Sequence, residues 1–161
     1  MDKLMRILCA GGLIITLVSG LALPSVASAD DKHGRTVPLL PSYRQECSSC
    51  HVAYPPGMLP AASWQQLMSN LPRHFGTDAS VDAATLKTLS SWLGANASSR
   101  SGGTLPPENR ITRSDWFVRE HREVASRTWK LPAVKSPSNC AACHTTADQG
   151  EFNDRNVRLP R

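Results

Sequence analysis

The sequence predicts an all-α, mainly helical fold, and three observations support this. Apolar residues recur at helical spacing in two long stretches, 81–96 and 113–129. No stretch shows the sustained apolar–polar alternation that is typical of a half-buried β-strand. Cysteines are concentrated in two short motifs, CSSCH at 47–51 and CAACH at 140–144, each of which fits on little more than one helical turn.

Helical segments are predicted, in chain order, at 42–51, 61–72, 81–96, 113–129 and 138–147. Ser80 is the expected N-cap of the third segment, and Gly94 or Asn96 is expected to end it. Thr112 or Ser114 is the expected N-cap of the fourth, because a side-chain oxygen just before an apolar-periodic stretch can accept bonds from the first free amides.

The segment 1–29 is predicted to be a secretory signal peptide. A basic start, MDKLMR, precedes an apolar run and the small-residue pattern that ends at Ala29. A retained membrane anchor is the alternative, but the cleavage pattern directly behind the run favours removal. Cleavage after Ala29 would leave 30–161 as the mature chain. We therefore expect an exported protein with at most peripheral membrane contact.

Composition divides the mature chain into two halves and argues against nucleic acid as a partner. The stretch 98–109 is rich in Ser, Gly and Pro, which is typical of a linker. It separates a first half, 30–97, from a second half, 110–161, and each half contains one C-x-x-C-H motif. The mature net charge is +5 − 2 + 1 = +4, and the basic residues are scattered without interleaved aromatics.

Each motif places two cysteines and a histidine together, as Cys47, Cys50 and His51, and as Cys140, Cys143 and His144. A disulfide redox pair would leave both histidines unexplained. A structural zinc site would place its two cysteine pairs roughly 15–20 residues apart, whereas most of the mature chain separates these pairs. Covalent c-type haem accounts for all six residues, because the thiols bond the porphyrin vinyl groups and the imidazole binds the iron.

We therefore predict two covalently attached haem c groups, with His51 and His144 as the proximal iron ligands. A mature chain of this size with modest aliphatic content makes only a thin core by itself. The expected core is consequently organised on the two buried porphyrins.

The first haem needs a sixth ligand, and His74 is the favoured candidate. It follows His51 along the chain and lies directly behind a segment that Pro72 is expected to end. Met58 is the alternative candidate. It follows His51 so closely that the chain between them has little length to pass around the edge of a porphyrin. Met68 has helical spacing within an apolar segment and is interpreted as a packing residue.

His121 is the corresponding candidate for the second haem. It precedes His144 by the same sequence separation at which His74 follows His51, and it shares one helical face with Phe117 and Val124. A histidine on such a face is ordinarily a core residue, but here an iron nearby lacks a donor. His33 lies in a polar segment beside the cleavage site and is interpreted as solvated.

The proline-rich loop after the first motif, HVAYPPGMLP, is predicted to orient the proximal imidazole. A ligating histidine usually donates its other ring N–H to a carbonyl or carboxylate. We expect a backbone carbonyl within 54–59 to accept this bond from His51, and an ordinary surface turn is the alternative.

Three stretches, YRQECSSCHVAYPPGMLPAASWQQLMSNLPRHFG, RITRSDWFVREH and CAACHTTADQGEFNDRNVRLPR, resemble the small bacterial dihaem cytochrome c family. The resemblance implies a first half similar to class I cytochrome c and two bis-histidine haems. It places His51 and His74 on one iron, and His144 and His121 on the other. It also implies a periplasmic or membrane-associated electron carrier, with a small oxygen-binding monohaem cytochrome or a membrane cytochrome b as partner.

Electron transfer is the predicted function, because two imidazoles on each iron leave no open position for a substrate. The alternative is a haem enzyme, or a gas- or peroxide-binding protein, in which one distal histidine dissociates. A zinc-binding structural module is the third hypothesis. A visible spectrum with and without carbon monoxide separates the first two.

Overall fold

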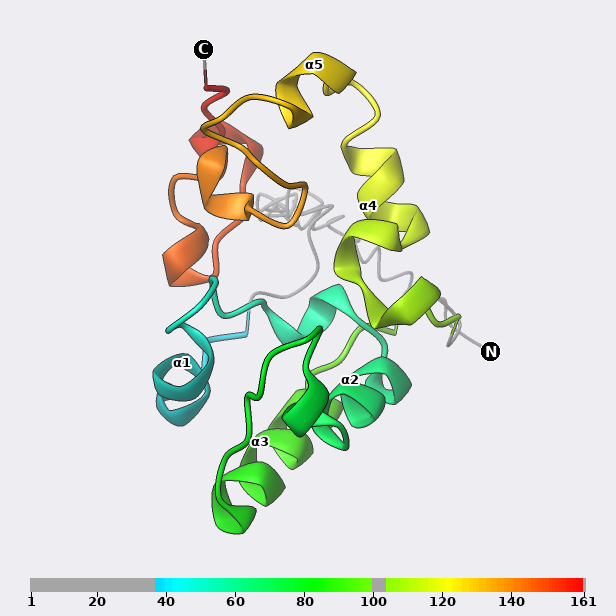
Figure 1. The fold of residues 1–161 in the computed structure, drawn as a ribbon, viewed down its shortest axis with the longest axis vertical. Helices are drawn as coiled ribbons and strands as arrows, with labels where there is room; N and C mark the ends of the chain where they lie inside the picture. The colour runs from blue at the N-terminus through cyan, green and yellow to red at the C-terminus, as the bar shows by residue number, and fades with distance from the viewer. Residues whose placement is uncertain (1–36, 100–103, 161) are drawn as a thin grey trace, which may run out of the picture. The chain divides into compact units, whose positions relative to one another are not determined.

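The computed structural model describes residues 37–99 and 104–160, and within these ranges the chain is helical, without a β-strand. Its α-helices are α1 (Pro41–Cys47), α2 (Ala61–Met68), α3 (Ala83–Ala95), α4 (Asp115–Glu120) and α5 (Ser126–Trp129) (Figure 1). Short 3-10 turns follow or separate them: η1 (Pro56–Met58), η2 (Leu71–Arg73), η3 (Pro107–Asn109), η4 (Ile111–Arg113), η5 (Cys140–Ala142), η6 (Ala147–Gln149) and η7 (Asp154–Asn156). The predicted mainly helical fold is confirmed.

Three sequence predictions lie partly or wholly beyond this range. The predicted signal peptide, its cleavage site after Ala29, and His33 are outside the described residues, as are residues 100–103 of the predicted linker. Within the described part of the chain, every helix is too short or too polar to cross a bilayer.

The predicted helix over 138–147 is wrong, because backbone partners from the end of the chain replace helical ones. The amide of Thr145 donates to the carbonyl of Asn156 at 3.2 Å, and the amide of Arg158 donates to the carbonyl of Cys143 at 2.8 Å. His144 and Val157 consequently form an isolated antiparallel bridge. Only the single turns η5 and η6 remain helical in this region.

The predicted helix over 113–129 is two short helices, α4 and α5. The amide of Val124 bonds the carbonyl of His121, three residues back, at 3.0 Å, and the backbone at Ala125 is extended with ψ of 139°. Helices of this length depend on tertiary packing for their stability, so their ends are decided by what their side chains contact. His121 is therefore at the end of α4 and not in the middle of a long helix.

The caps of α3 and α4 agree in part with the prediction. Asp82, and not Ser80, caps α3, because its carboxylate accepts bonds from the amides of Ala84 and Thr85 at 2.9 and 3.0 Å. The predicted end of this helix at Asn96 is confirmed. The predicted N-cap Ser114 is also confirmed.

The buried core is concentrated in the first half. Helices α2 and α3 lie side by side and pack on one another (Figure 1). One cluster of buried residues joins them to α1 and the loop before α2: Tyr43, Ala53, Leu59, Trp64, Met68, Leu89 and Leu93. Among the described residues of the second half, only Phe117, Val134 and Ala147 are buried apolar side chains. The second half thus has very little protein core of its own.

Replacing Ser114 with alanine is expected to lower the free energy of unfolding by about 1 kcal/mol, the usual cost of losing an N-cap. The buried Ser114 hydroxyl accepts from the amide of Phe117 at 3.3 Å and donates to the carbonyl of Ile111 at 2.7 Å. Urea denaturation followed by circular dichroism measures the change. Ser126→Ala, at an exposed serine that starts α5 without capping it, is the control, and an equal loss there would contradict the capping role.

Candidate functional site

A cavity of about 890 Å³ lies beside the first C-x-x-C-H motif. Cys47, Cys50 and His51 line it, and so does His74, which faces them from the turn after η2. The segments 109–112 and 138–141 also line it. Much of the remaining wall is apolar and comes from the first-half core: Tyr43, Leu59, Trp64, Met68, Leu89 and Leu93. The volume is in the range of cofactor sites, which are mostly apolar with few polar groups. We call these two cysteines and two histidines the first site.

His51 and His74 come together although the sequence separates them by a helix. Their ring centroids are 6.2 Å apart, with 30° between the ring planes. The Nδ1 atom of His51 lies 2.7 Å from the carbonyl oxygen of Val52, which can only accept, so Nδ1 is the protonated nitrogen and Nε2 has a free lone pair. The predicted carbonyl within 54–59 is therefore wrong, because the next residue in the chain already accepts this bond.

A tight turn positions His74. The amide of Thr77 donates to the carbonyl of His74 at 3.0 Å, and the two residues between them, Phe75 and Gly76, have positive φ values of 50° and 95°. Two positive φ values in succession are typical of a type I′ turn. Glycine accepts this backbone readily, but a bulky residue such as Phe75 does so only under strain. The Arg110 guanidinium lies 4.3 Å from the centre of the Phe75 ring and covers it.

Electrostatics keep His74 neutral. Burial, and secondly the neighbouring His51, lower the pKa of His74 from its ordinary value. The neutral imidazole is the form whose lone pair can bind a metal. Its Nδ1 atom is buried and has no hydrogen-bond partner among the described residues, so His74 lacks the carbonyl contact that orients His51.

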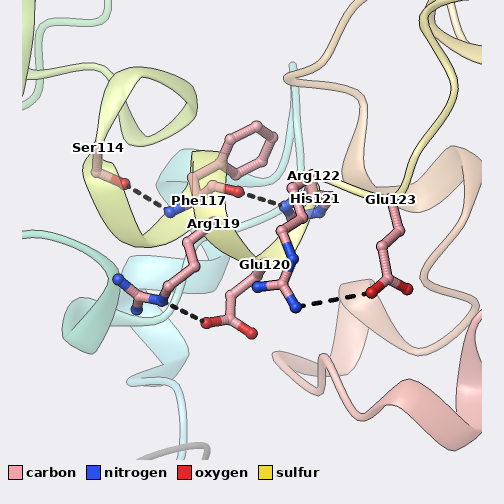
Figure 2. Close-up of polar contacts among 7 residues, drawn as sticks. All are labelled: Ser114, Phe117, Arg119, Glu120, His121, Arg122 and Glu123. Carbon is pink, nitrogen blue, oxygen red and sulfur yellow. Dashed lines mark hydrogen bonds and ion pairs between the residues drawn. The ribbon is translucent and has the colours of Figure 1, made fainter.

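His121 and His144 form a second pair, with ring centroids 6.1 Å apart and 68° between the ring planes. His121 is the C-cap of α4, and its Nδ1–H donates to the carbonyl oxygen of Phe117 at 2.9 Å (Figure 2). The His121 ring also stacks on the Phe117 ring, at 4.0 Å between centroids. This leaves Nε2 of His121 with a free lone pair. Together with Cys140 and Cys143, the two histidines form what we call the second site.

The backbone around His144 is held by the end of the chain. Beside the bridge to Val157, the Thr145 hydroxyl donates to the carbonyl of Asn156 at 2.8 Å. The ring of Phe152 lies 5.2 Å from that of His144. Backbone groups near the end of the chain thus bond the second motif and the residue after it, which explains why this segment is not a continuous helix.

The charged side chains of α4 and of the turn that follows it contribute little to the site. Arg119 pairs with Glu120, and Arg122 with Glu123, at 3.2 and 3.7 Å (Figure 2). All four side chains are more than half exposed, and exposed ion pairs are usually worth less than about 1 kcal/mol. The polar bond that matters for the site is therefore the one from His121 to the backbone of α4.

Within the described residues, the two cysteine pairs are not arranged as one shared metal site. The motif cysteines Cys47, Cys50, Cys140 and Cys143 are not paired with one another as disulfides. Burial raises the pKa of Cys47 and of Cys140 to about 11, so neither thiol has the lowered pKa that is typical of a reactive redox cysteine. In the described ranges no three histidine, cysteine or acidic side chains cluster as a metal site, so the two cysteine pairs do not combine.

The structure separates the two methionines, Met68 and Met58, by whether they line the cavity. Met68 is buried in the first-half core, as expected of a packing residue, and it also lines the cavity. Met58 is not among the residues that line the cavity, and its carbonyl accepts a bond from the indole N–H of Trp116 at 3.2 Å. The geometry therefore favours His74 over Met58 as the group facing His51.

Sequence reasoning missed Tyr54. Its ring stacks on His51, with 4.8 Å between centroids and 18° between planes, and its hydroxyl donates to the carbonyl of Ser138 at 3.0 Å. Burial, and secondly the Cys140 thiol, raise the pKa of Tyr54 to about 12, so the hydroxyl remains protonated. The available signal was an aromatic residue three positions after a motif histidine and directly before two prolines.

Comparison with known proteins identifies the family. The family described as dihaem cytochrome c matches residues 43–152. A crystal structure of DHC purified from Rhodobacter sphaeroides is 48% identical, with a TM-score of 0.62, and the match covers 72% of this chain and 99% of that one. A second solved structure, of a diheme cytochrome c from Rhodobacter sphaeroides, is 46% identical, with a TM-score of 0.64, and the match covers 73% of this chain and 100% of that one.

The diheme cytochrome type c of Shewanella baltica OS155 is 34% identical, with a TM-score of 0.66, and the match covers 77% of this chain and 95% of that one. A search of curated protein sequences gives no match. The predicted family resemblance is confirmed. The chain belongs to the dihaem cytochrome c family and therefore carries two covalently bound haem c groups in an electron-transfer role.

Proposed function

We propose that this protein is an exported electron carrier in which two histidines hold each haem iron. The observation that supports this best is the pair of histidine separations, 6.2 Å in the first site and 6.1 Å in the second, between ring centroids. Two imidazole–metal bonds of about 2 Å each, plus the distance from each nitrogen to its ring centre, give about 6 Å. Both pairs thus have the spacing that suits one iron between them.

In this proposal each motif binds one haem through its two cysteines and its histidine: Cys47, Cys50 and His51 in the first site, and Cys140, Cys143 and His144 in the second. His74 and His121 are the distal ligands. The bound haem iron supplies one-electron transfer between its ferric and ferrous states. The bonds from Nδ1 of His51 and His121 to backbone carbonyls fix the tautomer, so that each ring presents Nε2 to the metal.

The redox partners would meet the two haem-binding halves, 30–97 and 110–161, joined by the linker 98–109. The family implies redox partners in general. The specific partners that we propose are a small oxygen-binding monohaem cytochrome and a membrane cytochrome b. Export rests on the signal-like segment 1–29. Weak redox encounters of this kind use small interfaces.

A haem enzyme or gas-binding protein is the second candidate, and one observation says which ligand it would use. His74 is followed by Phe75 with a strained positive φ of 50°, and its buried Nδ1 has no hydrogen-bond partner among the described residues. Loss of such an outer contact weakens a ligating histidine. If one distal ligand dissociates, it is therefore His74 and not His121.

Visible spectra of the purified protein, oxidised and reduced, with and without carbon monoxide, test the proposal. We expect two low-spin haems in both oxidation states and no change on adding carbon monoxide, because each iron has two nitrogen ligands. A high-spin component, or a shift with carbon monoxide in the reduced protein, would contradict the carrier and favour the second candidate.

A further inference from the structure

We propose that Tyr54 is a positioning residue that joins the two haem sites, orienting the His51 imidazole with its ring and holding the segment that leads to Cys140 with its hydroxyl. The inference rests on the proposed role of His51 as an iron ligand. Tyr54 lies outside both C-x-x-C-H motifs, and in this proposal it holds the first site and the start of the second motif in a fixed position relative to one another.

On one side Tyr54 belongs to the first site. Its ring lies nearly parallel to that of His51, at 18° and 4.8 Å between centroids. The carbonyl of Tyr54 accepts a bond from the hydroxyl of Tyr43 at 2.9 Å, and Tyr43 is buried in the first-half core. The backbone and the ring of Tyr54 are thus both held in place. The stacked Tyr54 ring therefore orients the plane of the His51 ring.

On the other side Tyr54 belongs to the second site. Its hydroxyl donates to the carbonyl of Ser138, which is 84 residues later in the chain and two residues before Cys140. The Cys140 sulfur lies 3.7 Å from the same carbonyl oxygen. Residues 138–141 also line the cavity of the first site. The Tyr54 hydroxyl therefore holds a segment that has two roles. This segment is part of the wall of the first site, and it leads into the C-x-x-C-H motif of the second site.

Two other side-chain hydrogen bonds that link distant parts of the described chain do not have this property. Trp116 donates to the carbonyl of Met58, and the side chain of Asn109, within the predicted linker, donates to that of Gln66. Neither bond reaches a C-x-x-C-H motif. Tyr54 contacts the histidine of one motif and the backbone leading into the other, which distinguishes it from a residue that only packs the two halves together.

Tyr54→Phe, Tyr54→Leu and Tyr43→Phe, made in the holoprotein, test the proposal. Tyr43→Phe is the matched control, because it also deletes one phenol that donates to a backbone carbonyl, at 2.9 Å, but within the first half. Hydrogen–deuterium exchange of the peptide 136–142 is the first measurement. The net worth of one hydrogen bond predicts about 2- to 10-fold faster exchange there in Tyr54→Phe. A smaller change is expected in Tyr43→Phe, because this variant loosens the Tyr54 backbone but keeps the Tyr54 hydroxyl that bonds Ser138.

The EPR signal of the first haem is the second measurement, since it reports the angle between the two imidazole planes. Tyr54→Phe keeps the stacked ring and is expected to keep the signal, whereas Tyr54→Leu is expected to shift it. Equal exchange of 136–142 in Tyr54→Phe and Tyr43→Phe would overturn the proposal, and Tyr54→Phe decides this even if Tyr54→Leu fails to fold. Low-spin spectra of the unmodified protein test the bis-histidine assignment separately, so the two failures are distinguishable.

Discussion

Replacing His121 with alanine is expected to convert one of the two haems from low spin to high spin and to open it to carbon monoxide, while the other haem remains unchanged. The reason is geometric, because His121 faces His144 in the second site, with 6.1 Å between the ring centroids. Replacing His74 is expected to do the same to the first haem, which His51 would then bind alone. Visible and carbon monoxide difference spectra measure both changes.

EPR spectroscopy identifies which haem each variant affects. Low-spin ferric haems with nearly parallel imidazole planes give a rhombic signal, and those with nearly perpendicular planes give a signal with a large maximum g value. The ring planes differ by 30° in the first site and by 68° in the second. We therefore expect His74→Ala to remove the more rhombic signal and His121→Ala to remove the other.

His33→Ala is the control and should leave both signals intact, because His33 is predicted to be a solvated terminal residue. An unchanged spectrum in His74→Ala would contradict the assignment of the first site. A methionine would then be the sixth ligand, and Met68, which lines the cavity, would come before Met58 as the candidate. Met68→Leu in the His74→Ala background would decide between them.

The second large effect is expected from removing the cysteines of a motif. The double variant Cys140→Ala/Cys143→Ala should leave the second half unprotected against proteolysis, because its described residues bury only three apolar side chains, Phe117, Val134 and Ala147. A haem that binds only the folded half adds its binding free energy to stability, and its loss removes that term. Limited proteolysis with mass spectrometry locates the cleavage sites.

The matched variant Cys47→Ala/Cys50→Ala should be less severe. The first half retains a cluster of seven buried residues around α2 and α3, so some protection of these helices is expected to survive without its haem. A protease-resistant second half in Cys140→Ala/Cys143→Ala would show that the porphyrin does not organise its core. Equal sensitivity of both halves would contradict the asymmetry.

The helices show where local sequence is sufficient and where it is not. The segment that forms α3 was predictable because its apolar stripe, its length and its ending residue, Asn96, all indicate the same helix. Its N-cap was not, since Asp82 and not Ser80 caps it. The segments 113–129 and 138–147 have comparable local signals but were predicted wrongly. In 138–147, bonds to the end of the chain, such as the bridge between His144 and Val157, replace helical hydrogen bonds. In 113–129 the break is local, because the amide of Val124 bonds the carbonyl of His121, three residues back.

The sequence by itself determined the helical class and the two covalent haems, because the spacing of a C-x-x-C-H motif is a local property that no fold can alter. It also named the two candidate distal histidines. Only the tertiary structure decided which histidines face one another and at what angle. Those relations depend on a strained turn at Phe75, on the end of α4 at His121, and on a hydroxyl of Tyr54 that reaches a carbonyl 84 residues away. Such contacts close long loops, and no local pattern in the chain encodes them.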